Sequence, residues 1–252
     1  MKDMKKVLLA IVAVLSMTAC IPERSVFVKE PHAEKQVSAK GFVAIDVAGS
    51  PTVRYQQADS TTVEVTGPES QVENITVRVE NGRLKIGSKN DKSLLRMNSV
   101  DKVVVYVTSP DLIGVTLSGS GDFICETPLD TDTLKLLLRG SGDIDFASVL
   151  CDCLNAEVVG SGDVDVKQAQ TQMASLRLTG SGDLDVRLKN TAQTSISLLG
   201  SGDIDVDFDN CRLVDCQLRG SGDIELSGQI EHLTKQKSGS GSIDKGKLTI
   251  KK

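Results

Sequence analysis

The sequence predicts an all-β protein whose main body is a parallel solenoid with coils of about 20 residues. Three observations predict this class. From Gly41 onward, short apolar runs alternate with period two, as in Val53 and Tyr55 or Val103 and Val105. After the N-terminal segment, no stretch shows the 3.6-residue apolar stripe of an amphipathic helix. A Gly-Ser-Gly-Asp motif recurs at a nearly constant step, which indicates one coil per repeat, stacked by parallel strand pairing.

The composition narrows the function classes. The 252 residues carry 29 basic and 34 acidic side chains, a formal net charge of -5, so no basic excess is available to hold nucleic acid. Only two histidines, His32 and His232, are present, which leaves little material for a histidine-based metal site or a Ser-His-Asp triad. The composition therefore favours a protein without enzymatic activity.

The first element, residues 1–19, reads as a signal peptide. Three early lysines precede a nine-residue apolar stretch at 7–15, which is too short to span a bilayer. The sequence Met-Thr-Ala-Cys at residues 17–20 resembles the lipobox of bacterial lipoproteins, so Cys20 is expected to be lipidated, with palmitate among its acyl chains, and to become the mature N-terminus. An ordinary cleavable signal with an incidental cysteine is the alternative. Ile21 after the cysteine favours the outer membrane, by what is known of lipoprotein sorting.

Residues 20–40 follow as a lipid-anchored tether, because they contain two prolines, mixed charges and no sustained periodicity. Residues 41–115 form an N-terminal β-strand part of the head domain, with turn signals such as Gly67-Pro68 and Asn81-Gly82 between the runs. Residues 116–252 form the repeat β-helix with a C-terminal cap. Both periplasmic and outward-facing placements of this head are compatible with the sequence.

The repeat supplies the corners of the coils. Gly-Ser-Gly-Asp begins at Gly119, Gly140, Gly160, Gly180, Gly200 and Gly220, and a Gly-Ser-Gly-Ser variant begins at Gly239. Glycine adopts positive φ without a Cβ penalty, so the paired glycines are expected to form the structural turns. These turn residues are Gly140, Gly142, Gly160, Gly162, Gly180, Gly182, Gly200 and Gly202.

Phasing each repeat on its first glycine predicts the core. Before Gly180, the inward positions are Leu176 and Leu178, and after it they are Leu184 and Val186, with equivalent apolar residues in the other coils. The remaining stretch of each coil is polar and is expected to close it by turns or a third short strand. In the last coil, lysines 235 and 237 occupy columns that are apolar elsewhere, as an end cap requires.

Several segments of the sequence resemble those of the putative auto-transporter adhesin, head GIN domain family of bacterial envelope lipoproteins. The resemblance rests on Gly-Phe-Val-Ala-Ile-Asp-Val at 41–47, Val-Arg-Tyr-Gln-Gln at 53–57, Gly-Pro-Glu at 67–69, Val-Glu-Asn-Gly-Arg-Leu at 79–84 and the Gly-Ser-Gly-Asp ladder. It covers about residues 41–245. It implies a right-handed parallel β-helix on the cell envelope, and it brings no catalytic residues with it.

Two acidic columns follow the corners, at the third and fifth positions after the first glycine. One interpretation is a Ca²⁺ site, since Gly-x-Gly-x-Asp turns of parallel β-rolls bind this ion. The other is that the first aspartate accepts backbone N–H bonds at the corner while the second faces water. The candidate metal ligands are Asp143, Asp145, Asp163, Asp165, Asp183, Asp185, Asp203 and Asp205.

Five cysteines follow Cys20, an odd number that cannot all pair within one chain. Cys125 and Cys216 lie in apolar columns, and Cys151 and Cys211 share a phase three coils apart, beyond disulfide reach. Cys153 lies two residues after Cys151, a poor geometry for a bond. Free thiols are therefore expected.

Three functions are consistent with the sequence. The first is a non-enzymatic envelope lipoprotein that serves as an adhesion or interaction scaffold for a protein or surface partner. The second is the same rod stabilised by Ca²⁺, with no other cofactor. The third is a polysaccharide-acting β-helix enzyme that uses paired carboxylates. The expected partners are the membrane, through the N-terminal lipid, and other copies of the chain, through exposed strand edges.

Overall fold

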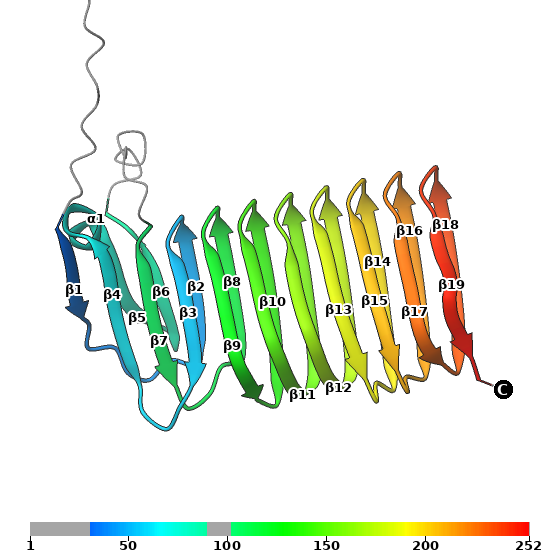
Figure 1. The fold of residues 1–252 in the computed structure, drawn as a ribbon, viewed down its shortest axis with the longest axis horizontal. Coiled ribbons are helices and arrows are strands. Elements are labelled where there is room, and N and C mark those ends of the chain that lie inside the picture. Colours follow the sequence, from blue (N-terminus) through cyan, green and yellow to red (C-terminus); the bar gives the residue numbers. More distant parts are fainter. Residues whose placement is uncertain (1–30, 90–101, 252) are drawn as a thin grey trace, which may run out of the picture.

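The computed structural model describes residues 31–89 and 102–251, and it is a right-handed parallel β-solenoid of about 7 turns with coils of about 20 residues (Figure 1). The signal peptide 1–19, Cys20 and the start of the tether lie outside the described residues. Within the described part of the chain, no helix has the length and apolar character needed to cross a membrane.

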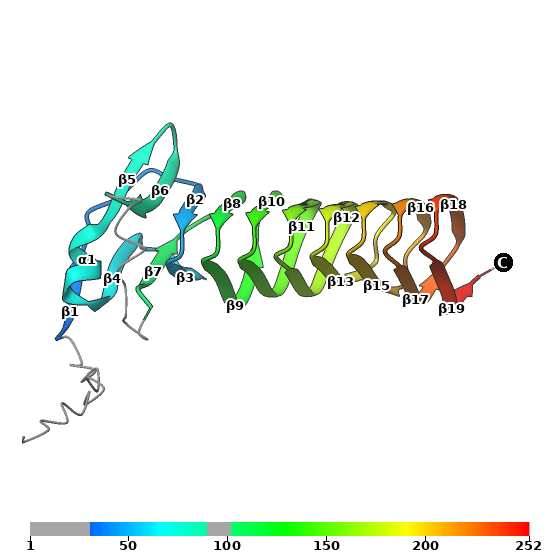
Figure 2. The ribbon, with the colours of Figure 1, turned by 90° about the horizontal axis from the view of Figure 1, so that it is seen from above.

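Each coil contributes one strand to each of two sheets. Sheet 1 holds the strands that follow the corners, and sheet 2 holds those that precede them (Figure 2). In order, sheet 1 contains β7 (Val104–Ser109), β3 (Thr52–Gln57), β9 (Asp122–Asp130), the first parts of β11 (Asp143–Gly160) and β12 (Val164–Gly180), β13 (Asp183–Lys189), β15 (Asp203–Asp209), β17 (Ile224–Ile230) and β19 (Ile243–Ile250).

Sheet 2 runs beside it in the same order along the rod. It contains β6 (Arg83–Ser88), β2 (Ala44–Gly49), β8 (Gly114–Gly119), β10 (Thr133–Gly140), the second parts of β11 and β12, β14 (Gln193–Gly200), β16 (Leu213–Gly220) and β18 (His232–Gly239). Pairing is in register, because Gly180 lies opposite Gly160 on one side and Gly200 on the other.

The N-terminal end departs from the parallel pattern. β4 (Thr62–Pro68) pairs antiparallel with β7, and β1 (His32–Gln36) pairs antiparallel with β4. The expectation of a tether over residues 20–40 is therefore wrong for His32–Gln36, which form a strand of the folded end. The short helix α1 (Glu69–Asn74) leads into β5 (Ile75–Glu80), which forms an antiparallel hairpin with β6 around Asn81 and Gly82. Both turn residues have positive φ, as this tight turn requires.

The core lies between the two sheets, and the four predicted inward columns are buried. Leu176, Leu178, Leu184 and Val186 are all within a few per cent of full burial. The prediction that the closing stretch of each coil is polar is wrong in part, because this stretch supplies further buried columns. One of them contains Leu129, Val149, Ala169, Leu188 and Phe208.

β11 and β12 also run unbroken through this stretch, so a turn is not needed to close those two coils. The polar residues that suggested a turn alternate with small buried residues such as Ala169, Thr171 and Ala174. A period-two pattern with small inward residues gives a weak apolar signal, although it is a strand.

The two glycines of each corner both allow close stacking of the coils, but they differ in backbone conformation. The first has positive φ, 139° at both Gly160 and Gly180. The second does not, so the prediction that both glycines serve positive φ is wrong for Gly162 and Gly182. A Cβ on either glycine would collide with the preceding coil, because Gly180 faces the carbonyl oxygen of Gly160 and Gly182 faces that of Gly162. The second glycine is therefore required by the close approach of successive coils.

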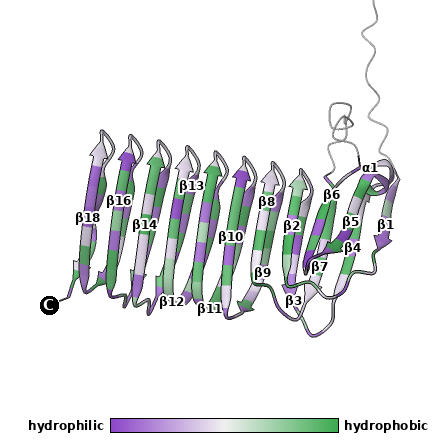
Figure 3. Ribbon diagram, turned by 180° about the vertical axis from the view of Figure 1, so that it is seen from behind, coloured by the Kyte–Doolittle hydropathy of each residue, from purple (hydrophilic) through white to green (hydrophobic). Residues whose placement is uncertain are grey.

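The last coil is a polar cap, as predicted. Lys235 and Lys237 are exposed, although their register partners Cys216 and Leu218 are buried. In Figure 3, β18 is coloured largely hydrophilic, whereas strands of earlier coils carry hydrophobic segments. The open end of the stack therefore exposes charge in place of core.

The cysteines at positions 125, 151, 153, 211 and 216 are free, which confirms the prediction. Four of them are buried, and Cys153 is half-buried. Burial raises the pKa of the Cys125 thiol to about 11 and that of Cys216 to about 12. Both thiols therefore pack as small apolar groups at neutral pH.

Candidate interaction surface

The outer face of sheet 1 carries both predicted acidic columns. We call the positions three residues after the first glycine the first column and those five residues after it the second column. The first column contains Asp122, Asp143, Asp163, Asp183, Asp203 and Asp223, and the second contains Asp145, Asp165, Asp185, Asp205, Glu225 and Asp244. Strand register brings the members of each column together one coil apart, because each coil repeats the same backbone path.

Carboxylates of the first column accept hydrogen bonds from the next coil. The backbone N–H of Asp183 donates to Oδ1 of Asp163 over 2.8 Å, and that of Asp223 donates to Oδ1 of Asp203 over 2.9 Å. The N–H of Asp203 makes the same bond to Asp183 over 3.3 Å. These carboxylates do cap backbone N–H groups, and the groups they cap belong to the following coil.

In the Gly-Ser-Gly-Ser variant that begins at Gly239, Ser242 stands where the other repeats have an aspartate. The N–H and the hydroxyl of Ser242 both donate to Oδ1 of Asp223, over 2.7 and 2.8 Å. The serine hydroxyl therefore adds a second donor to the same carboxylate oxygen.

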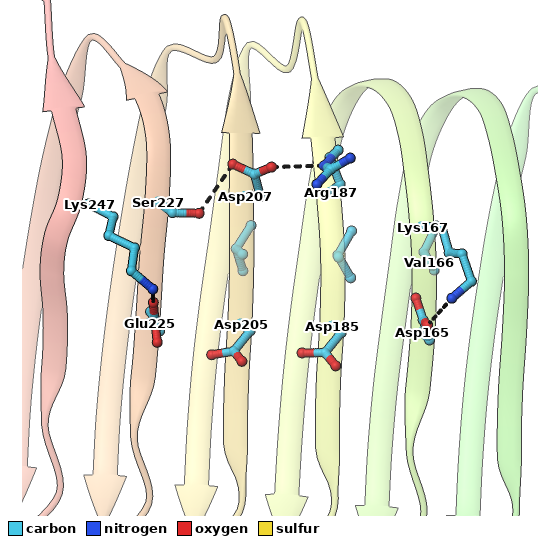
Figure 4. A pocket seen from close by; sticks show the side chains of 12 residues that line it. Asp165, Val166, Lys167, Asp185, Arg187, Asp205, Asp207, Glu225, Ser227 and Lys247 are labelled. Atoms are coloured by element: carbon cyan, nitrogen blue, oxygen red, sulfur yellow. Dashed lines mark hydrogen bonds and ion pairs between the residues drawn. The ribbon is translucent and has the colours of Figure 1, made fainter.

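The second column has no equivalent donors. Asp165 pairs with Lys167 over 2.9 Å, and Glu225 pairs with Lys247 over 2.6 Å, whereas Asp185 and Asp205 form no ion pair with any described residue (Figure 4). At the strand spacing of about 4.8 Å, two carboxylates repel by roughly 1 kcal/mol in a water-like dielectric.

The environment shifts the pKa of the second column upward. Partial burial, followed by the charge of Asp205, raises the pKa of Asp185. Partial burial, followed by the charge of Glu225, raises the pKa of Asp205, and Asp145 shifts in the same direction. Within the second column, Asp185 and Asp205 are therefore adjacent carboxylates that repel each other and have no ion-pair partner among the described residues.

These side chains line a shallow groove of about 550 Å³ across β12, β13, β15, β17 and β19. The groove is also lined by the basic residues Lys167, Arg187 and Lys247. Arg187 pairs with Asp207 over 2.8 Å. The sequence reasoning missed Lys167, Arg187 and Lys247. The same phasing could have found the first two, because both lie at the seventh position after the first glycine.

The groove presents carboxylates of successive coils beside one another. Within the part of the chain that the structure describes, no three His, Cys, Asp or Glu side chains converge as a metal-binding group. The eight candidate ligands lie in columns along the rod, so a cation would meet carboxylates from adjacent coils.

Comparisons with known proteins give one family match. The model of the family described as "Putative auto-transporter adhesin, head GIN domain" matches residues 41–208 and 171–252. No curated protein matches the chain.

Solved structures are similar over most of the chain. A putative adhesin from Bacteroides fragilis NCTC 9343 has 27% identity and a TM-score of 0.75, with 85% of this chain and 97% of that chain covered. A protein from Parabacteroides distasonis ATCC 8503 described as a putative lipid binding protein has 25% identity and a TM-score of 0.68, with 84% and 95% covered. A putative adhesin from the same strain, at 19% identity and a TM-score of 0.70 over 85% and 96%, shares the fold.

Proposed function

Because the chain belongs to the putative auto-transporter adhesin, head GIN domain family, we propose that it is a cell-envelope lipoprotein whose rod is a non-enzymatic scaffold for adhesion. The N-terminal lipid on Cys20 would hold the protein at the outer membrane. The tether would then carry the solenoid away from the bilayer, with the acidic face of sheet 1 open along its length.

The observation that carries this proposal is the second acidic column. Asp185 and Asp205 lie opposite each other on adjacent strands, and neither forms an ion pair with a described basic residue. A straight row of charges at fixed spacing fits a partner that also repeats, such as a surface bearing many cationic groups. The proposed partner chemistry is therefore polycationic.

Retention of cells on a polylysine-coated surface tests this partner chemistry. Cells that express the full chain with Asp185→Asn and Asp205→Asn should be retained several-fold less than cells with the native chain. The matched control is Glu157→Gln with Asp215→Asn, which removes two exposed acids from sheet 2. Equal losses in both variants would show that net charge alone matters, and they would contradict a role for this face.

The anchor is tested separately. Metabolic labelling with an alkyne analogue of palmitate should mark the native chain and not Cys20→Ala. Protease accessibility on intact cells then reports the side of the membrane on which the rod lies. Labelling that persists in Cys20→Ala would contradict the proposed lipidation site.

Ca²⁺ binding is the second candidate, favoured by the register that places Asp145, Asp165, Asp185 and Asp205 beside one another on successive strands. A cation between coils would offset their repulsion. Calcium should then raise the melting temperature of the native chain, and less so with Asp185→Asn and Asp205→Asn. An unchanged melting temperature would rule out this version of the rod.

A further inference from the structure

A second groove, of about 660 Å³, lies on the outer face of sheet 2 near its N-terminal end. It forms where the β5–β6 hairpin projects away from the line of the rod (Figure 2). Residues of β2, β5, β6, β8 and β10 line it, so it joins the irregular end of the molecule to the first regular coils. Its volume falls within the range typical of small-ligand sites.

Small side chains form the floor of this groove. Register places Ser118 between Ala48 and Arg139 on neighbouring strands. Gly87 lies beside Ala48, since a Cβ on Gly87 would be 3.7 Å from the Cβ of Ala48. The low floor is bounded by Arg139 on one side, and Thr76 of β5 lies next to Gly87 on the other.

The walls of the groove are basic. Nε of Arg83 donates to both carboxylate oxygens of Asp46 over 2.8 Å, and Nη2 donates to Oδ1 of Asp46 and, over 3.1 Å, to the hydroxyl of Thr116. Arg78 and Lys85 share the carboxylate of Glu80, over 2.6 and 2.7 Å. Together with Arg139, the groove and its edge therefore contain four basic side chains and two acidic ones, Asp46 and Glu80.

Arg139 differs from the other three. It is exposed, and no carboxylate among the described residues pairs with it. The groove is thus locally cationic on a chain of net charge -5. A guanidinium can donate two parallel hydrogen bonds to one phosphate, and the hydroxyls of Thr76 and Ser118 can add donors from the floor.

We propose that this groove binds a phosphate-bearing ligand, with Arg139 as the principal contact to the phosphate. The phosphate would lie over the small-residue floor, between Arg139 and the β5–β6 hairpin. Arg83, fixed by Asp46 and Thr116, would keep the wall in place and add positive potential. The site is distinct from the acidic groove, which lies on the other sheet.

The chain offers a matched control for Arg139. Arg219 occupies the same position, one residue before the first glycine of a corner, and it is also exposed on sheet 2. It lies four coils further along, where no hairpin rises beside the sheet. Arg139→Gln and Arg219→Gln therefore remove the same charge from the same face, inside and outside the groove.

Titration calorimetry on the full chain in a non-ionic detergent tests the proposal. The probes are glycerol 3-phosphate and dihexanoyl phosphatidic acid, which share a phosphomonoester and differ in acyl chains. At least one should bind the native chain, and Arg139→Gln should weaken that binding about tenfold while Arg219→Gln leaves it unchanged. Binding of both probes indicates a soluble phosphate ligand, and binding of the acylated probe alone indicates a lipid headgroup.

Two results would overturn the proposal. One is that neither probe binds. The other is that Arg139→Gln and Arg219→Gln weaken binding equally, because that outcome reflects general attraction to positive charge. Thermal melting of both variants should match the native chain, since both side chains are exposed and lie outside the core.

Discussion

Aspartates two residues apart in one coil have opposite energetic effects. Asp183 accepts the N–H of Asp203, so its charge has a donor in the next coil. Asp185 has no such donor and lies next to Asp205. Residue type alone therefore does not determine whether an acid on this face stabilises the rod, because the outcome depends on which backbone groups the carboxylate reaches.

Removing the first kind of aspartate should destabilise the protein. Asp163→Ala leaves the N–H of Asp183 without its acceptor, so urea unfolding should show a loss of about 1 kcal/mol. Asp163→Asn keeps an oxygen at the same place and should lose clearly less. Equal losses in the two variants would mean that the hydrogen bond contributes nothing.

Removing an aspartate of the second column should stabilise the protein. Asp185→Asn relieves repulsion along the column, so its unfolding free energy at pH 7 and low salt should rise by up to about 1 kcal/mol. The folded-state pKa of Asp185 is raised, so the native state binds more protons than the unfolded state. Stability therefore falls as pH rises through the window from the ordinary carboxyl pKa to the raised one.

Urea unfolding measured from pH 3 to pH 7 tests the direction of this pH dependence of the unfolding free energy. The native chain should lose stability across this window because of Asp185, and Asp185→Asn should show a shallower dependence. High salt should reduce the difference between the two. A variant less stable than the native chain at pH 7 would refute the repulsion.

Among the elements, β18 determines how the stack ends. Its inward positions hold Lys235 and Lys237, whereas the strand itself pairs with β16 on one side only. A free edge with apolar inward residues would be ready to accept another coil or another copy. The two lysines therefore prevent continuation of the core at this edge.

Restoring the apolar columns should remove that protection. Lys235→Ile with Lys237→Leu should shift the protein toward larger species, measured by light scattering after size-exclusion chromatography. The control is Thr234→Ile with Gln236→Leu, which adds equal apolar surface to the outward side of the same strand. If both variants associate to the same extent, surface hydrophobicity is the cause and the end-cap explanation fails.

The regular elements could be predicted from the sequence because one coil repeats another. A fixed step places residue i beside residue i+20, so corners, core columns and acidic columns follow from phasing alone. The antiparallel β1–β4–β7 end and the groove around Arg139 could not be predicted this way. Arg78 and Arg139 are brought together by a hairpin outside the repeat, and no periodic signal connects them.

The two glycines of the corner show a finer limit. The motif indicates a tight corner. The sequence alone does not show whether a glycine is needed there for a positive φ or because a neighbouring backbone leaves no room for a Cβ. Only the stacked backbones reveal that Gly182 faces the carbonyl of Gly162. Side-chain pairs across coils, such as Arg187 and Asp207, also require the actual rotamers.

At the scale of the whole molecule, the rod should tolerate changes of length in units of one coil. Deletion of residues 181–200 joins Gly180 to Ser201 and leaves every column in register. This variant should unfold cooperatively, with a urea m-value lower by about a tenth.

Deletion of residues 181–190 is the control, because it removes half a coil and puts strands of one sheet beside strands of the other. This variant should lose cooperative unfolding and the circular dichroism of the native sheet. A half-coil deletion that folds as well as the full-coil deletion would contradict the one-coil unit.

The hydrogen bonds of the first column also all run in one direction along the rod. At every rung the acceptor belongs to the earlier coil and the donor to the later one, from Asp163 to Ser242. A chain that assembles from its N-terminus therefore always presents a ready template to the coil that arrives next. At Ser242 the column changes from a carboxylate to a hydroxyl, which donates to the preceding coil.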